Sequence, residues 1–164
     1  MSRKEASSKT NAARILDRAG IPYELRAYVA DEEDISAPHV AEATALPPEQ
    51  VFKTLPARGD RTGVLLACIP GSAELDLKAL ADASDNRKVE LAAVKDVLGL
   101  TGYIRGGVSP LGTKKPLPLF LDQTVLLRDV VWVSAGVRGS RRLLTPADLA
   151  PVAEAQLCDI ARFS

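Results

Sequence analysis

The chain has 164 residues, 46% of them hydrophobic, and its 21 basic and 21 acidic side chains leave no net charge. This length suits one domain, residues 1–164, with its own core, and the zero net charge argues against a protein that coats itself in a polyanion. No segment approaches the roughly 20 apolar residues of a membrane span, and the N-terminus lacks the apolar core of a signal peptide. We therefore expect a cytoplasmic protein with no membrane partner.

Short helices and strands alternate along the chain at irregular spacing. In chain order the patterns predict a helix over 8–19, a strand over 21–30, a helix over 37–45, strands over 51–57 and 62–69, a helix over 75–83, a strand near 89, a helix over 92–98, extended segments over 119–122 and 125–127, strands over 130–134 and 143–144, and a helix over 146–155. Gly20 and Gly99 are placed to end helices, and Thr145 to cap the last one. This interleaving predicts a mixed α/β (α+β) fold with a curled sheet.

Four of the eleven glycines fall in one run, Thr101–Lys115, which we call the glycine segment. Glycine lets backbone N–H groups approach a ligand closely, and the adjacent Lys114 and Lys115 favour an anion. The segment is not a P-loop, because Thr113-Lys114 reverses the Lys-Ser/Thr order and prolines follow where a helix should start. Two readings stay open, a binding site and a bulged turn whose glycines serve only the backbone.

Charge is unevenly distributed along the chain. Residues 31–50 hold six acidic and no Lys or Arg side chains, whereas residues 105–142 hold seven basic and two acidic ones. Such a polarised molecule can bind one end of a nucleic acid, although most charge runs are only solvated faces.

Few residues offer catalytic or metal-binding chemistry. The single histidine, His39, has no triad or metal-ligand pattern around it, so we expect no metal and no cofactor. Cys68 lies in an apolar run and is expected in the core. Lys53 lies inside a predicted strand with apolar neighbours, where it faces either solvent or a cleft that holds a phosphate or an oxyanion.

Taken together, these motifs resemble the YbaK family of aminoacyl-tRNA deacylases, which is related to the editing domain of bacterial prolyl-tRNA synthetases. The resemblance runs from about Ile21 to Phe163. It is carried by Pro48–Thr54, Leu75–Lys78, Thr101–Gly112, Lys115–Pro118 and Val133–Gly139.

The resemblance implies a mixed sheet curled into a partial barrel and a free-standing enzyme that hydrolyses mischarged tRNA, most of all cysteine on proline tRNA. Its expected partners are the acceptor end of aminoacylated tRNA and prolyl-tRNA synthetase. The expected catalytic residues are Lys53, Gly106 and Gly107. The expected substrate-binding residues are Tyr28, Phe52, Thr54, Ser109, Lys114 and Arg138.

In this scheme Lys53 holds the terminal phosphate or ribose, and N–H groups near Gly106 and Gly107 polarise the ester carbonyl. No protein nucleophile is evident, which fits attack by the thiol of the substrate itself. Lys114, Lys115, Arg138, Arg141 and Arg142 are expected to grip phosphates.

One position departs from the family pattern. The cysteine-editing branch usually carries an acidic residue where this chain has Arg141. Two other functions therefore stay open: a deacylase for alanine or another small amino acid, and a non-catalytic module that binds tRNA or a synthetase. A purely structural globule is the remaining alternative.

Overall fold

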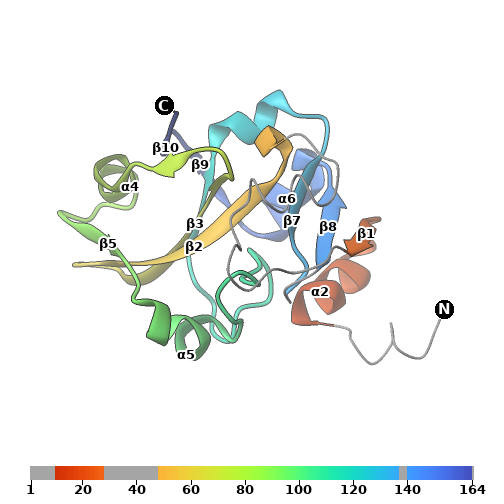
Figure 1. Ribbon diagram of the computed structural model, residues 1–164, viewed down its shortest axis with the longest axis horizontal. Helices are drawn as coiled ribbons and strands as arrows, with labels where there is room; N and C mark the ends of the chain where they lie inside the picture. The colour runs from red at the N-terminus through yellow and green to blue at the C-terminus, as the bar shows by residue number, and fades with distance from the viewer. Residues whose placement is uncertain (1–9, 28–47, 137–139, 164) are drawn as a thin grey trace.

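The computed structural model describes residues 10–27, 48–136 and 140–163 (Figure 1). The strands are β1 (Glu24–Ala27), β2 (Phe52–Gly59), β3 (Gly63–Pro70), β4 (Glu74–Leu75), β5 (Val89–Leu91), β6 (Leu119–Asp122), β7 (Val131–Ser134), β8 (Ser140–Leu144), β9 (Gln156–Cys158) and β10 (Ala161–Arg162). The helices are α2 (Asn11–Ala19), α4 (Leu77–Ala83), α5 (Val97–Thr101) and α6 (Pro146–Val152), with 3-10 turns η1 (Pro48–Gln50), η2 (Val94–Asp96) and η3 (Gln123–Leu127).

The strands form three sheets. Five strands in the order β5-β2-β3-β6-β9 make the main sheet, three in the order β1-β8-β7 make a second, and β10 pairs with β4. The β2–β3 and β2–β5 pairs are antiparallel, whereas β6 runs parallel to both β3 and β9. The predicted mixed α/β fold is confirmed, and the described sheets do not close into a barrel.

Two hydrophobic cores lie on the two faces of the β2–β3 hairpin. Phe52, Leu66 and Cys68 belong to the first core, which also takes in α2, the glycine segment, β7 and α6. Leu65, Ala67 and Ile69 belong to the second core, which packs against α4 and Ile160. Because side chains alternate along a strand, β2 sends odd- and even-numbered residues to different cores.

The helix before β1 shows why its sequence folds locally. Thr10 caps α2 by accepting a hydrogen bond from the Ala13 N–H over 3.3 Å, and Gly20 ends the helix at a φ of 69°. Leu16 is fully buried on the inner face, as the sequence pattern predicts.

Several expected boundaries were wrong. Gly99 does not end a helix but lies inside α5, which ends at Gly102 with a φ of 82°. The extended segment expected over 125–127 is the 3-10 turn η3, because the Asp122 carboxylate accepts from the Thr124 N–H and turns the chain. The last helix ends at Val152, three residues early. The helix expected over 37–45, which contains His39, lies outside the described residues.

Cys68 is fully buried, as expected, and burial raises the pKa of its thiol to about 12. Within the described ranges, no helix combines the length and the apolar character needed to cross a membrane.

Candidate functional site

A cavity of about 240 Å³ opens beside β2, at the place where the glycine segment passes that strand. It is lined by Thr54, Leu55, Pro56, Leu91, Ala92, Val94, Val97, Arg105, Gly106 and Val108. These residues come from β2, from the stretch between β5 and α5, and from the glycine segment. The cavity therefore joins two of the sequence motifs that predicted a binding site.

The edge of β2 is open at this point because β5 is short. β5 pairs only with Ala57–Gly59, and the Ala92 N–H then donates to the Pro56 carbonyl over 3.0 Å. Before Pro56, no described strand of the main sheet covers this edge. Thr54 therefore lies at a gap in the sheet, which the glycine segment borders.

The glycine segment is held in shape by Tyr103. The phenol of this residue donates to the carbonyl oxygens of Leu111 over 2.7 Å and Gly112 over 3.1 Å. Gly112 lies so close to α2 that an added Cβ would come within 2.8 Å of the Asn11 backbone. In Figure 1 the segment accordingly runs between α5 and α2. The segment is a fixed loop, and its glycines permit close packing.

Gly106 and Gly107 have different roles in this loop. Gly106 has a φ of 85° and borders the cavity. The Gly107 N–H already donates to the Ile104 carbonyl over 2.9 Å, which closes a turn. Of the predicted pair, Gly106 is thus the one that faces the cavity, and Gly107 holds the turn.

Lys53 starts on the opposite face of β2 from Thr54. It is paired with Ile69, so its side chain leaves β2 on the side of the second core. Its Nζ lies 3.4 Å from the carbonyl oxygen of Gly71 and interacts electrostatically with the carboxylate of Glu74. Lys53 is half-buried, and this desolvation lowers the pKa of its ammonium despite the opposing effect of Glu74. Lys53 is not among the residues that line the cavity.

Three other predicted substrate-binding residues lie in different environments. The Phe52 side chain is fully buried in the first core. Ser109 is also fully buried, and its Oγ accepts from the Leu111 N–H over 3.2 Å. Lys114 is exposed on the glycine segment. Tyr28 and Arg138 lie outside the described residues.

Arg141 and Arg142, two of the residues expected to grip phosphates, are buried rather than exposed on the surface. Each is only 5% exposed. The Arg141 Nη1 donates to the Phe52 carbonyl over 3.0 Å, a contact that sequence reasoning did not foresee. Among the cavity residues, those near β5 and α5 were also missed, because their approach to β2 is a tertiary contact without a local signal.

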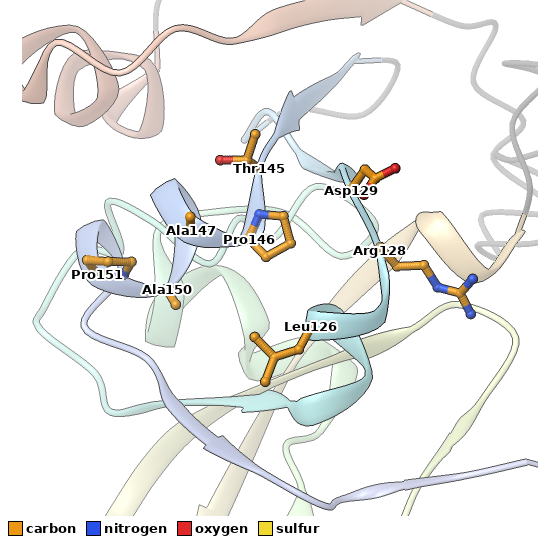
Figure 2. A pocket seen from close by; sticks show the side chains of 8 residues that line it. All are labelled: Leu126, Arg128, Asp129, Thr145, Pro146, Ala147, Ala150 and Pro151. Carbon is orange, nitrogen blue, oxygen red and sulfur yellow. The ribbon is translucent and has the colours of Figure 1, made fainter.

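A second hollow lies between η3 and α6. Figure 2 shows its lining side chains, with Leu126 opposite Pro146, Ala150 and Pro151. Its volume is about 480 Å³, and none of the predicted site residues lines it. No group of three or more His, Cys, Asp or Glu side chains placed to hold a metal ion occurs in the part of the chain that is described.

Residues 32–151 match the family model of the aminoacyl-tRNA editing domain. The chain is 41% identical over 160 residues to the Enterococcus faecalis protein named "Putative Cys-tRNA(Pro)/Cys-tRNA(Cys) deacylase EbsC", with 98% of each chain covered. It is 29% identical over 109 residues to the Bacillus subtilis protein YwhH, covering 66% of this chain and 69% of that one.

Solved structures give the same result. A protein described as "a putative trans-editing enzyme for prolyl tRNA synthetase" matches with a TM-score of 0.80 and 25% identity, with 99% of each chain covered. The hypothetical protein APE2540 matches in fold with a TM-score of 0.85 at 22% identity, covering 93% of this chain and 100% of that one. The family model spans most of the sequence and the Enterococcus relative nearly all of it, so the chain belongs to the aminoacyl-tRNA editing domain family.

Proposed function

We propose that this protein removes a wrongly attached amino acid from tRNA by cleaving the ester to the terminal ribose, with cysteine on proline tRNA as the preferred substrate. The observation that carries the proposal is the shared cavity of Thr54 and Gly106, which joins two of the motifs on which the family resemblance rests. The name of the Enterococcus relative supports the choice of cysteine.

The cavity takes the aminoacyl group in this proposal. Its volume of about 240 Å³ suits a small side chain and the ester carbonyl, and most of its lining is apolar. The Gly106 N–H, which makes no hydrogen bond with any described residue, donates to the carbonyl oxygen as negative charge develops there. A preorganised donor of this kind contributes roughly 3 kcal/mol of transition-state stabilisation.

Lys53 holds the nucleotide rather than the amino acid. Leu55 lines the cavity and lies two residues along β2 on the same face as Lys53, a separation of roughly 7 Å. A ligand that extends from the cavity past Leu55 along β2 therefore reaches the ammonium. There Lys53 binds the phosphate or a ribose hydroxyl of the last nucleotide.

The cavity supplies position and polarity but no strong nucleophile. Thr54 carries its only hydroxyl, and the lining has no carboxylate, thiol or imidazole. The thiol of the substrate cysteine then attacks the ester carbon, and the ribose oxygen departs with the proton as a small thiolactone ring closes. Water opens the ring afterwards. Proline and serine lack the thiol, so selectivity and catalysis have one origin.

A second candidate substrate is alanine. The apolar lining around Pro56, Val97 and Val108 suits a methyl group and favours selection by size. An alanine ester has no thiol, so its cleavage requires a water molecule held by the site.

The test is deacylation of cysteine- and alanine-charged proline tRNA by wild type, Lys53→Ala and Thr54→Val, with the exposed Lys78→Ala as control. Cleavage of the cysteine ester that Lys53→Ala abolishes supports the proposal. Cleavage of the alanine ester favours size selection. Tight binding without cleavage of either ester means a binding module, and addition of prolyl-tRNA synthetase tests whether a partner is needed.

A further inference from the structure

Arg142 carries a buried charge that no anionic side chain among the described residues balances. It lies on β8 and is 5% exposed, and its side chain makes no hydrogen bond or ion pair with any described residue. Its Nε is fully buried without a hydrogen-bond partner. Its one specific contact is with Tyr23, whose ring centroid lies 4.5 Å from the guanidinium carbon.

This contact satisfies only part of the guanidinium. Stacking on an aromatic ring engages the flat face of the group, whereas its five N–H donors point outward along the edge. A buried charge without a partner is strongly unfavourable, and proteins normally pair it or hydrogen-bond it. No described residue therefore supplies a hydrogen-bond acceptor for the N–H groups along the edge of the Arg142 guanidinium.

The surroundings of Arg142 favour an anion and provide an approach to it. Tyr23 is half-buried, and its hydroxyl bonds the exposed Asp17 carboxylate over 3.2 Å, so this ring extends from solvent to the guanidinium. On the glycine segment, burial raises the pKa of Tyr103 to about 12, and the nearby positive charge of Arg142 opposes this rise. That segment contains no Asp or Glu and carries the exposed Lys114 and Lys115. The Tyr103 hydroxyl donates to the Leu111 and Gly112 carbonyls, and no hydrogen bond joins it to the described Arg142 side chain, so it is not the missing acceptor.

We propose that Arg142 is the receptor of an internal oxyanion site between Tyr23 and the glycine segment, and that this site takes a phosphate group. The planar fork of a guanidinium matches two oxygens of a phosphate, and a charge-assisted pair of this kind satisfies the free edge. Arg142 does not line the cavity beside Gly106, so the site stands whether or not that cavity cleaves an ester. Free inorganic phosphate and the phosphates of an RNA end are the two sources of the ligand.

The experiment compares thermal unfolding of wild type and Arg142→Met in sodium phosphate and in sodium chloride at equal ionic strength and pH. Met fills similar space without charge. We expect phosphate to raise the wild-type Tm saturably, by about 3 °C or more, and to leave no such difference in Arg142→Met. Phosphate also stabilises proteins by exclusion from their surface, and the variant removes this contribution because exclusion acts on both proteins alike. The exposed Arg87→Met is the matched control and keeps the full rise.

Calorimetric titration of the wild type with inorganic phosphate measures binding directly and does not depend on whether Arg142→Met folds. Binding of one phosphate per chain supports the site, and absence of binding overturns it. A rise in Tm that persists in Arg142→Met also overturns it, because the anion then binds elsewhere. A short single-stranded RNA ending in CCA distinguishes the sources: competition with inorganic phosphate identifies the RNA end, and independent binding identifies free phosphate.

Discussion

Arg141 on β8 donates from Nη1 to the carbonyl oxygen of Phe52 over 3.0 Å, which joins the second sheet to the main sheet one residue before Lys53. At this position the family resemblance leads us to expect an acidic residue in the cysteine-editing branch. A carboxylate cannot make the same contact, because it would face a carbonyl oxygen with no hydrogen to donate. Arg141 therefore stabilises the start of β2 in a way that its acidic counterpart does not.

The first prediction concerns this contact. We expect Arg141→Asp to lower the free energy of unfolding by about 3 kcal/mol or more, because it buries an unpaired carboxylate against the Phe52 carbonyl. Urea denaturation measures the loss, with the exposed Arg87→Asp as control. Unchanged stability of Arg141→Asp would show that the site repacks readily and that Arg141 is not a structural link.

A second prediction follows from the half-buried Lys53. Burial lowers the pKa of the Lys53 ammonium in the folded protein. At neutral pH the charged form of Lys53 is therefore less favourable in the folded state than in the unfolded chain. We expect Lys53→Met to be more stable than wild type at pH 7. This advantage should shrink as the pH rises through the lowered pKa toward 10.5, the ordinary pKa of lysine, because wild-type Lys53 then becomes neutral.

Chemical denaturation at several pH values measures this difference, with the exposed Lys78→Met as control. A variant that is less stable at pH 7 would mean that the bond from Lys53 to the Gly71 carbonyl outweighs desolvation. The combination of higher stability and lost deacylation would identify Lys53 as a residue kept for function at a cost in stability.

The third prediction compares two glycines near the cavity. Gly106 has a φ of 85°, a conformation that costs an L-residue roughly 1–2 kcal/mol. Gly99 lies inside α5 with nothing within 4 Å of an added Cβ. We therefore expect Gly106→Ala to lower stability and deacylation together. Gly99→Ala should raise stability by up to about 1 kcal/mol and leave deacylation unchanged. Melting curves and initial rates of deacylation for both variants check this. If the two substitutions had equal effects on stability and deacylation, Gly106 would have no special role.

A fourth prediction isolates Thr54. Its Oγ1 is buried and has no hydrogen-bond partner among the described residues, so Thr54→Val, which has the same shape, should leave stability unchanged or slightly raised. If the hydroxyl meets the substrate, deacylation falls while stability does not. Steady-state kinetics beside urea denaturation separates the two effects. A loss of stability with unchanged kinetics would make Thr54 a structural residue only.

The sequence was most informative where a local signal is strong. The strands β2 and β3 were predicted from their apolar runs, and α2 from its periodicity and Gly20. Gly99 misled the prediction because Gly102, three residues on, supplies the left-handed cap, and both glycines fit a helix end equally well. The two short strands β9 and β10 carry no periodicity long enough to detect.

The site was predictable in its motifs but not in its geometry. The motifs identified Thr54 and Gly106, which the fold brings to one cavity. Whether Lys53 faces solvent or a cleft depends on its pairing with Ile69, which the sequence pattern does not contain. Leu91 and Val94 enter the cavity only because β5 ends early and the chain turns at η2. The burial of Arg141 and Arg142 likewise depends on packing between sheets.

The last prediction concerns how the protein binds RNA. Lys114 and Lys115 are exposed neighbours on a segment without acidic residues, and this segment borders the cavity, so we expect them to contact the phosphates of a bound tRNA. Each phosphate contact releases counterions and adds about 0.7 to the slope of log affinity against log salt for a single strand. We expect the double variant Lys114→Ala, Lys115→Ala to reduce this slope by up to about 1.4 and to weaken binding at low salt more than at high salt. Filter binding of tRNA over a range of salt concentrations measures the slope, with Lys78→Ala on α4 as control. If the double variant keeps the wild-type slope, the phosphates are held elsewhere, and the basic character of the glycine segment does not contribute to RNA affinity.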